Sequence, residues 1–222
     1  MKKNESDFLE YIVSQGYQPG DRLPPLFDIG NELSLSVGKL REQLHVARSL
    51  GLVSVKPRDG IRVEEYSFRY GVAQSLIYAL GLDAGYFQSF SELRVRVEAA
   101  FFPAAAQLLL PEDKAELVAL VQRARAKLNG EPIHIPHAEH RRLHLMIYQR
   151  FENPFVIGLL EAYWDAYESI ELNIYSDYQY LCTVWDYHAQ MVAAVVDGKY
   201  ELGRDIFVEH TRLLRPRVVQ SP

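Results

Sequence analysis

Hydrophobic and polar residues follow two different patterns along this chain of 222 residues, and the change falls near residue 66. Before that point, short stretches of helical periodicity lead into a pair of alternating, strand-like runs. Beyond it, apolar residues recur at helical spacing with hardly any strand alternation. The chain is therefore predicted to be mainly α-helical, with one domain over residues 1–66 and a second over 67–222.

The first domain is predicted to contain three helices and a hairpin. Apolar residues share one face in NESDFLEYIVSQG (4–16), LFDIGNELSLS (26–36) and SVGKLREQLHVARSLG (36–51). In LVSVKPRDGIRVEEY (52–66), apolar positions alternate on both sides of an Asp-Gly turn, which predicts a β-hairpin. This order of elements, in about 65 residues, is that of a winged helix-turn-helix.

The second domain is predicted to be an all-α bundle of about seven helices. The helical stretches are separated by segments that carry glycine, proline or an acidic helix start, such as GLDAGY, LLPED and NGEPIHIP. The expected helices lie near 68–80, 87–109, 112–128, 136–151, 155–175, 178–197 and 200–217.

Composition narrows the class of protein. Hydrophobic residues make up 48% of the chain and charged residues 24%, as in ordinary globular proteins. The chain has no run of eighteen apolar residues, and its N-terminal stretch lacks the apolar core of a signal peptide, so we expect neither a membrane span nor secretion. The single cysteine, Cys182, cannot form an internal disulfide, which favours a reducing compartment, and we expect a cytoplasmic protein.

Charge is unevenly distributed along the chain. The net charge of −5 argues against a protein whose whole surface is positively charged for binding nucleic acid. Residues 36–62, however, contain six basic side chains against the two acidic residues Glu42 and Asp59. This local excess of positive charge is either a phosphate-binding face or a chance fluctuation.

Three of the seven histidines lie within HAEHRRLH, residues 137–144. His140 and His144 are four residues apart, so their side chains project from one face of a helix, as a pair of ligands would. Two imidazoles are too few to bind a transition metal tightly, and the other ligands must come from elsewhere in the bundle. The candidates are His188 and His210, in two later helices. Alternatively, each is an ordinary core or half-exposed histidine.

The motifs of the first domain resemble the DNA-binding domain of the GntR family of bacterial transcription regulators. The matching residues are Pro19-Gly20-Asp21, Leu23-Pro24, Leu35-Ser36, Arg41-Glu42-Gln43-Leu44, Gly51-Leu52-Val53 and Gly60. The resemblance implies that operator DNA is contacted by two segments, the start of the recognition helix and the wing. Their candidate residues are Ser36, Lys39 and Arg41 in the helix, and Lys56, Arg58 and Gly60 in the wing.

The chain departs from the family pattern at two positions in this domain. Val37 and Phe27 stand where the family usually has arginines. The loss of two phosphate or base contacts in each monomer should weaken electrostatic affinity for DNA and flatten its salt dependence.

Most of residues 75–218 resembles FCD, the helical ligand-sensing domain of FadR-type GntR regulators. The matching residues are His140 and His144, Asn153-Pro154, His188 and the helix after it, Asp197-Gly198, and His210. In such proteins an aspartate and three histidines bind a divalent metal, often zinc or nickel. Because His140 stands in place of the aspartate, the resemblance implies a site formed by His140, His144, His188 and His210.

A four-histidine site is chemically sound for zinc, nickel or copper. It carries one more positive charge than the site with an aspartate, which favours an anionic further ligand such as the carboxylate of an effector. Two alternatives remain. Either Glu139 or water replaces His140 as a ligand, or all four histidines line a cavity for a metal-free effector.

A further match to FCD proteins lies in the helix near 87–109. Arg94 and Glu98 reproduce an Arg-x-x-hydrophobic-Glu motif, in which the arginine often points into the cavity and meets an acid effector. The resemblance therefore implies that Arg94 binds the effector. The alternative is an exposed Arg94–Glu98 helix pair that stabilises the helix by a few tenths of a kcal/mol.

Together these features predict a ligand-responsive, DNA-binding transcription regulator of repressor type, and not an enzyme. We expect a homodimer formed by the helical domain, with operator DNA and a small organic acid as partners and no membrane association. One competing hypothesis is a metal-dependent hydrolase with Glu139 as its general base. Another is a ligand-binding protein that has lost specific DNA binding.

Overall fold

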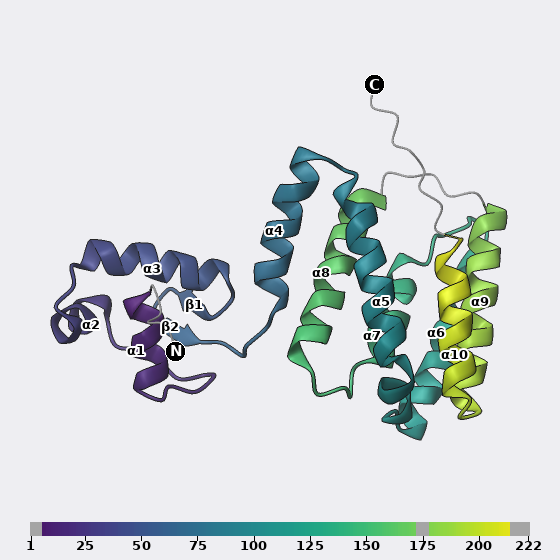
Figure 1. The fold of residues 1–222 in the computed structure, drawn as a ribbon, viewed down its shortest axis with the longest axis horizontal. Helices are drawn as coiled ribbons and strands as arrows, with labels where there is room; N and C mark the ends of the chain where they lie inside the picture. Colours follow the sequence, from purple (N-terminus) through teal and green to yellow (C-terminus); the bar gives the residue numbers. More distant parts are fainter. Residues whose placement is uncertain (1–5, 172–177, 214–222) are drawn as a thin grey trace. The chain divides into compact units, whose positions relative to one another are not determined.

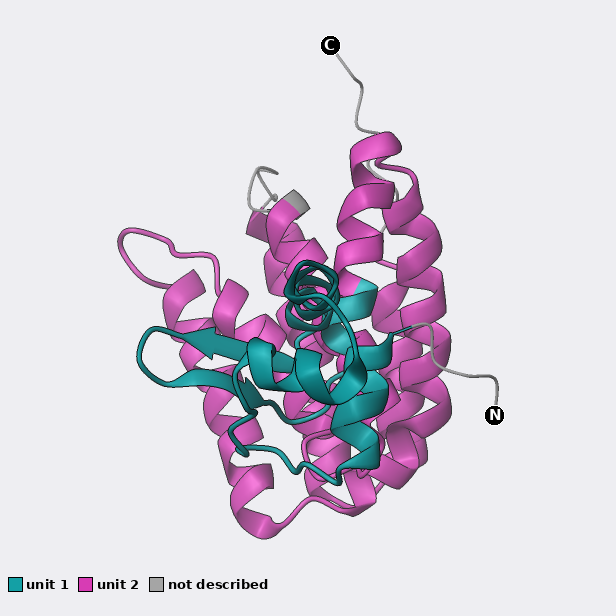
Figure 2. Cartoon of the chain, turned by 90° about the vertical axis from the view of Figure 1, so that its left-hand side faces the viewer, with its two compact units in different colours: residues 1–72 teal, residues 73–222 magenta. Residues whose placement is uncertain are grey.

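The computed structural model of the chain describes residues 6–171 and 178–213. In these residues the chain forms ten helices and a two-stranded antiparallel sheet (Figure 1). It divides into two compact units between Val72 and Ala73 (Figure 2). The mainly helical fold class, with a winged helix-turn-helix followed by a helical bundle, is confirmed. Within the same ranges, no helix is both long and apolar enough to cross a membrane.

The first unit has the predicted order of elements. These are α1 (Asp7–Ser14), α2 (Leu26–Leu33), α3 (Val37–Ser49), β1 (Val53–Lys56) and β2 (Gly60–Val63). The two strands pair from Val53 with Val63 to Lys56 with Gly60. Phe8, Ile29, Leu40 and Ala47 are fully buried and form the centre of its core. The apolar stripes expected from periodicity therefore face one another, which holds the recognition helix α3 against α1 and α2.

The second unit contains the seven predicted helices. They are α4 (Arg69–Leu82), which begins in the first unit, α5 (Tyr86–Gln107), α6 (Pro111–Leu128), α7 (His137–Ile147), α8 (Pro154–Glu171), α9 (Tyr178–Val196) and α10 (Tyr200–Thr211). The predicted helix 136–151 ends early, at Ile147. Turns with i→i+3 hydrogen bonds follow it at Tyr148 and Gln149. The side chain of Asn153 then accepts the backbone N–H of Val156 and so caps the start of α8. Parts of the predicted helices 155–175 and 200–217 lie outside the described residues.

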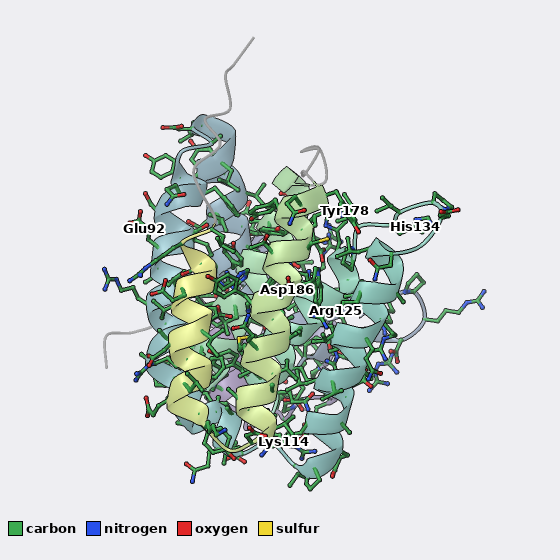
Figure 3. The ribbon with its side chains drawn as sticks, turned by 90° about the vertical axis from the view of Figure 1, so that its right-hand side faces the viewer. Glu92, Lys114, Arg125, His134, Tyr178 and Asp186 are labelled. Atoms are coloured by element: carbon green, nitrogen blue, oxygen red, sulfur yellow. The ribbon has the colours of Figure 1, made fainter. Side chains whose placement is uncertain are left out.

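Helix α10 packs against both α9 and α5, and α6 packs against α9 and α7. Figure 3 shows the side formed by α6, α9 and α10, where Arg125 of α6 and Asp186 of α9 form an ion pair of 2.9 Å. Gly203 allows α10 to approach α5, because a Cβ atom there would lie 3.0 Å from the ring of Phe102. This close packing brings the C-terminal part of α10, and with it His210, into the centre of the bundle.

Helix α3 ends at a glycine that no other residue can replace without strain. Gly51 has a φ of +68°, and a Cβ atom there would lie 2.2 Å from the ring of Tyr70. Tyr70 belongs to the first turns of α4, so this glycine lets the start of α4 cover the end of the recognition helix.

We expect Gly51→Ala to lower the stability of the first unit by at least about 2 kcal/mol, because it adds backbone strain to a steric overlap. Hydrogen–deuterium exchange of the α1 and α3 amides would measure this, since it reports on that unit alone. Gly38→Ala is the matched control in the same helix. Its Cβ would meet only the Ser36 hydroxyl at 3.9 Å, so stability should be unchanged or slightly higher. Equal protection in the two variants would contradict the role of Gly51.

Candidate metal centre and nucleic-acid interface

Four histidines from three helices meet in the core of the second unit. His140 and His144 project from one face of α7, His188 comes from α9, and His210 comes from α10. One nitrogen from each ring can be chosen so that all four lie within 4.8 Å of one another. The structure thus brings together the four histidines that the sequence proposed as a metal site.

The rings are packed closely and are almost completely shielded from water. The ring centroids of His188 and His210 are 4.4 Å apart, and the longest separation in the set, between His140 and His210, is 6.2 Å. His144, His188 and His210 are 0–2% exposed, whereas His140 is partly exposed. Aromatic rings surround the cluster, with Trp164 against His140 and Trp185 against His188, each at 4.8 Å.

Burial keeps the four imidazoles neutral. Desolvation holds the pKa of each histidine well below its ordinary value of about 6.5. The positive charge of Arg94 lowers all four further, and repulsion between the rings contributes for His140, His188 and His210. Metal ligation requires the neutral ring, so the electrostatics of the core prepare the protonation state that a ligand needs.

The arrangement of donor atoms fits a divalent metal. The Nε2 atoms of His144 and His188 face one another at 3.1 Å, close to the separation of roughly 3.3 Å that bonds of about 2.0–2.1 Å give in a tetrahedral zinc site. Among the described residues, the Nδ1 atoms of His188 and His210 have no hydrogen-bond partner. Buried imidazoles normally find partners for both nitrogens, so each of these two rings has a nitrogen that the protein leaves available as a ligand.

A buried ion pair supports the cluster from α5. Arg94 and Glu98, one helical turn apart, form a contact of 2.8 Å and are 2% and 0% exposed. Arg94 also lies 3.0 Å from Nδ1 of His144, and the nearest Glu98 oxygen lies 3.7 Å from the same atom. Burial raises the pKa of Glu98 to about 7, although Arg94 opposes this rise. The guanidinium packs against the rings of Tyr163, Trp164 and Phe207 at 4.5–5.6 Å.

A narrow cleft leads from the surface to one side of the cluster. Its free volume of about 20 Å3 has room for roughly one water-sized molecule. The cleft is lined by Ile135, Pro136, His137, His140, Tyr167, Tyr180, Leu181, Val184, Trp185 and His210. An organic acid could therefore reach the histidines only if side chains of this wall move.

The structure places two other predicted site residues away from this cleft. Arg94 lies behind His144, in contact with Glu98, and is not part of the cleft wall. Glu139, considered as a replacement ligand or a general base, forms a 2.7 Å ion pair with Lys127. Sequence reasoning missed Trp185 beside the cluster, although it lies three residues before His188 and therefore on the same face of α9.

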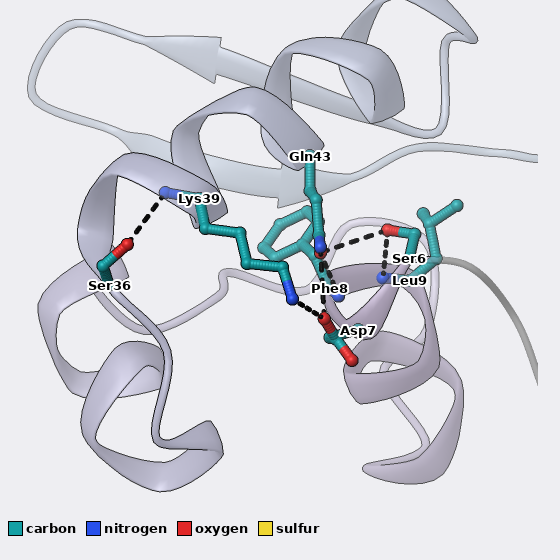
Figure 4. Close-up of polar contacts among 7 residues, drawn as sticks. All are labelled: Ser6, Asp7, Phe8, Leu9, Ser36, Lys39 and Gln43. Carbon is teal, nitrogen blue, oxygen red and sulfur yellow. Dashed lines mark hydrogen bonds and ion pairs between the residues drawn. The ribbon is translucent and has the colours of Figure 1, made fainter.

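The start of the recognition helix is tied to α1 by a polar network (Figure 4). The hydroxyl of Ser36 accepts the backbone N–H of Lys39 and so caps α3, as predicted. The ammonium group of Lys39 forms a 2.9 Å ion pair with Asp7, and Gln43 donates to the same carboxylate. Lys39, one of the predicted DNA-binding residues, is therefore engaged in an intramolecular ion pair. This pairing could not be predicted from local patterns, because the two residues are 32 positions apart.

Gln43 completes the network by capping the other helix. Its side-chain oxygen accepts the backbone N–H of Phe8 at 2.7 Å, and the Ser6 hydroxyl accepts the N–H of Leu9. Two otherwise unpaired N–H groups at the start of α1 are thereby satisfied. The recognition helix is thus fixed to the body of the unit before any DNA is bound.

The wing between β1 and β2 holds the other predicted DNA-binding residues. Arg58, at its tip, has a φ of +68°, a left-handed conformation that is uncommon for a residue with a side chain. Gly60 has a φ of +83°, and a Cβ there would lie 3.1 Å from the guanidinium of Arg22. Arg62 is bound to Asp59 at 2.7 Å and to the carbonyl of Gly20. The turn therefore presents Arg58 at the tip while Arg62 braces its base.

Residues 89–213 match the FCD domain family, which is more than half of the chain. Over 194 residues the chain is 26% identical to an uncharacterized HTH-type transcriptional regulator of Escherichia coli K12, YieP, covering 84% of this chain and 81% of that protein. Its fold is similar to that of Streptococcus agalactiae GntR, with a TM-score of 0.66 and 18% identity over 92% of this chain and 93% of that chain. At this identity the second comparison supports the shared fold alone.

We expect the metal-free protein to lose stability as the pH falls below about 6.5. The four histidines then bind protons in the unfolded chain but not in the folded one, because their folded pKa values are lowered. Glu98 has the opposite effect on stability. Because its pKa is raised to about 7, it binds one proton in the folded protein that it does not bind in the unfolded chain. The net effect is an uptake of up to three protons on unfolding. Urea unfolding between pH 7.5 and 5.5, followed by the fluorescence of Trp164 and Trp185, would measure it.

His134→Ala is the control for this experiment, because His134 is exposed and lies outside the cluster. Its pH profile should match that of the wild type. A wild-type unfolding free energy that is flat between pH 7 and 5.5 would show that the cluster does not stay neutral in the folded protein.

Proposed function

The chain belongs to the FCD domain family, and on this premise we propose that it is a ligand-responsive, DNA-binding transcription regulator of the GntR type. The observation that carries the proposal is the four-histidine cluster, which lies inside a helical unit that follows a winged helix-turn-helix. The winged helix binds operator DNA, and the helical unit holds a divalent metal and senses a small organic acid. The protein acts as a homodimer in the cytoplasm, where its operator is found.

His140, His144, His188 and His210 hold the metal. Zinc and nickel suit a set of imidazole nitrogens, and the core excludes the oxygen-rich ligation that calcium or magnesium prefers. When bound, the metal supplies a positive charge that attracts a carboxylate. Four neutral ligands leave that charge uncompensated, and the Arg94–Glu98 pair adds no net negative charge to offset it. An acid effector therefore binds where the protein concentrates positive charge away from water.

The DNA-binding role rests on α3 and the wing. Arg41 is exposed near the start of α3, where side chains of a recognition helix reach base edges in the major groove. Arg58 and Lys56 approach the backbone or the minor groove from the wing. Two copies of each surface in a dimer match the two halves of a palindromic operator. Effector binding changes the packing of the helical bundle and so the spacing of the two winged helices, and repression is the expected mode.

The proposed role is regulatory and not enzymatic. The only carboxylate considered as a general base, Glu139, pairs with Lys127 in place of facing the histidines. This pairing favours a sensor in which the metal binds a ligand without turnover.

Elemental analysis of protein purified without a histidine tag would test the metal site. We expect about one zinc or nickel per chain in the wild type and loss of most of it in His144→Ala, because the variant removes one of the four ligands. His140→Asp should retain the metal, since a carboxylate can replace an imidazole as a ligand. The matched control His134→Ala should contain as much metal as the wild type. A metal content that does not differ between His144→Ala and the wild type would remove His144 from the site.

Binding to the promoter region of the protein's own gene would test the DNA-binding role. We expect Arg41→Ala to weaken binding about tenfold or more, the scale of one lost arginine–base contact in each subunit. Asp7→Asn should strengthen binding severalfold and steepen its salt dependence, because it frees Lys39 for a phosphate. Arg123→Ala, which removes an exposed cation of the helical unit, serves as the control. If Arg41→Ala binds as tightly as the control, α3 does not read the operator as proposed.

The sensing role needs a separate measurement. A panel of small organic acids, added to metal-loaded protein, should contain members that change operator affinity by about five- to hundredfold, the usual range of such coupling. Identical affinity with and without an acid that demonstrably binds the protein would rule out the regulatory proposal.

A further inference from the structure

We propose that Arg94 positions His144 in the metal-free protein, and that metal binding by His144 displaces Arg94 from it. The inference rests on the metal site of the proposed function and adds a residue that lies outside the ligand set. It follows from the hydrogen bonds around the two nitrogens of His144.

The metal-free core fixes which nitrogen of His144 carries the proton. A guanidinium group can only donate hydrogen bonds, so Nδ1 of His144, 3.0 Å from Arg94, must act as the acceptor. A ring whose Nδ1 accepts a hydrogen bond is neutral, so the proton of His144 is on Nε2. Nε2 then donates to Nε2 of His188 at 3.1 Å, which places the proton of His188 on Nδ1.

This chain of donors ends in a buried group without a partner. Nδ1 of His188 has no acceptor among the described residues, and this nitrogen lies in a ring that is fully buried. A buried unpaired donor costs about 1–3 kcal/mol. The metal-free arrangement therefore satisfies Nδ1 of His144 and leaves Nδ1 of His188 without an acceptor among the described residues.

Metal ligation by His144 is incompatible with the hydrogen bond from Arg94, whichever nitrogen binds the metal. If Nε2 is the ligand, its proton moves to Nδ1, and two donors, Nδ1–H and the guanidinium, would face one another at 3.0 Å. If Nδ1 is the ligand, the metal occupies the lone pair that Arg94 now uses. A neutral ligating imidazole thus excludes Arg94 in both cases.

Glu98 can accept a hydrogen bond from Nδ1–H of His144 once Nε2 is the ligand. Its oxygen Oε1 lies 3.7 Å from Nδ1 of His144, and a small movement would let it accept a hydrogen bond from Nδ1–H. Metal-bound histidines commonly donate their second N–H to a carboxylate in this way. Arg94 can keep its 2.8 Å contact with the other oxygen, Oε2, while it leaves the histidine. The exchange moves one proton within the His144 ring, through solvent, and leaves the total charge of the three residues unchanged.

Nitrogen-15 NMR of the full-length protein, labelled at histidine and arginine, would test the exchange. His144→Gln and Arg94→Met assign the signals. In metal-free protein we expect Nδ1 of His144 to be unprotonated and Nε2 to carry the proton. One equivalent of zinc should either move the proton of His144 from Nε2 to Nδ1 or make Nδ1 a ligand. In both cases it should shift the guanidinium signals of Arg94.

The variants separate positioning from a merely structural role. Metal-free Arg94→Met should show both tautomers of His144, because the donor that selects one of them is absent. Arg96→Met removes an exposed arginine from the same helix and should keep the single tautomer of the wild type. The wild-type zinc titration stands by itself if Arg94→Met does not fold.

Three outcomes would overturn the inference in distinguishable ways. If zinc shifts the signals of His140, His188 and His210 while His144 keeps its Nε2 proton and Arg94 does not respond, the inference is wrong and a three-histidine metal site stands. If none of the four histidines responds to zinc, the metal site of the proposed function fails and the inference fails with it. If Arg94→Met leaves a single metal-free tautomer, Arg94 does not position His144.

Discussion

The centre of the helical unit depends on a shortage of hydrogen-bond partners. Each neutral imidazole needs one acceptor and one donor, and four rings from α7, α9 and α10 share a volume into which few other polar groups project. Among the described residues, two ring nitrogens, Nδ1 of His188 and Nδ1 of His210, are left without a partner. A core that serves only packing would be more stable with apolar side chains here, because each unpaired polar group costs about 1–3 kcal/mol. Under the proposed function, the core keeps these polar rings because each offers one nitrogen as a metal ligand.

The same reasoning explains a buried ion pair that would otherwise lower stability. Burying Arg94 and Glu98 requires both charges to leave water, and such a pair is often no better than apolar residues of the same size. Beside His144, however, the pair supplies a donor when the site has no metal and an acceptor when it has one. The guanidinium of Arg94 also packs against the rings of Tyr163 and Trp164. The pair therefore provides the two hydrogen bonds that the histidine needs in its two states.

The sequence predicted the features that depend on local patterns and missed those that depend on packing. All seven helices of the second unit follow from periodicity, because each apolar stripe is a property of one segment. The end of α7 was placed four residues too late, because the chain passes into i→i+3 turns at Tyr148 and Gln149, which apolar periodicity does not reveal. Spacing alone paired only His140 with His144. His188 and His210 were candidates in later helices, and the resemblance to FCD proteins joined all four into one site. Whether Arg94 faces a cavity, water or the core could not be read from α5 itself, since the neighbouring helices decide it.

The DNA-binding unit shows how few cations are left for phosphate binding. Lys39 is paired with Asp7 and Arg62 with Asp59, and the exposed Phe27 stands where the family has an arginine. A lysine that exchanges a carboxylate for a phosphate releases fewer counterions and gains less free energy than an unpaired one. Under the proposed function, binding by one subunit is therefore weak, and stable occupancy of an operator requires both subunits at once. A regulator built in this way responds strongly to any change in the spacing of its two DNA-binding units, because losing one contact surface leaves too little affinity in the other.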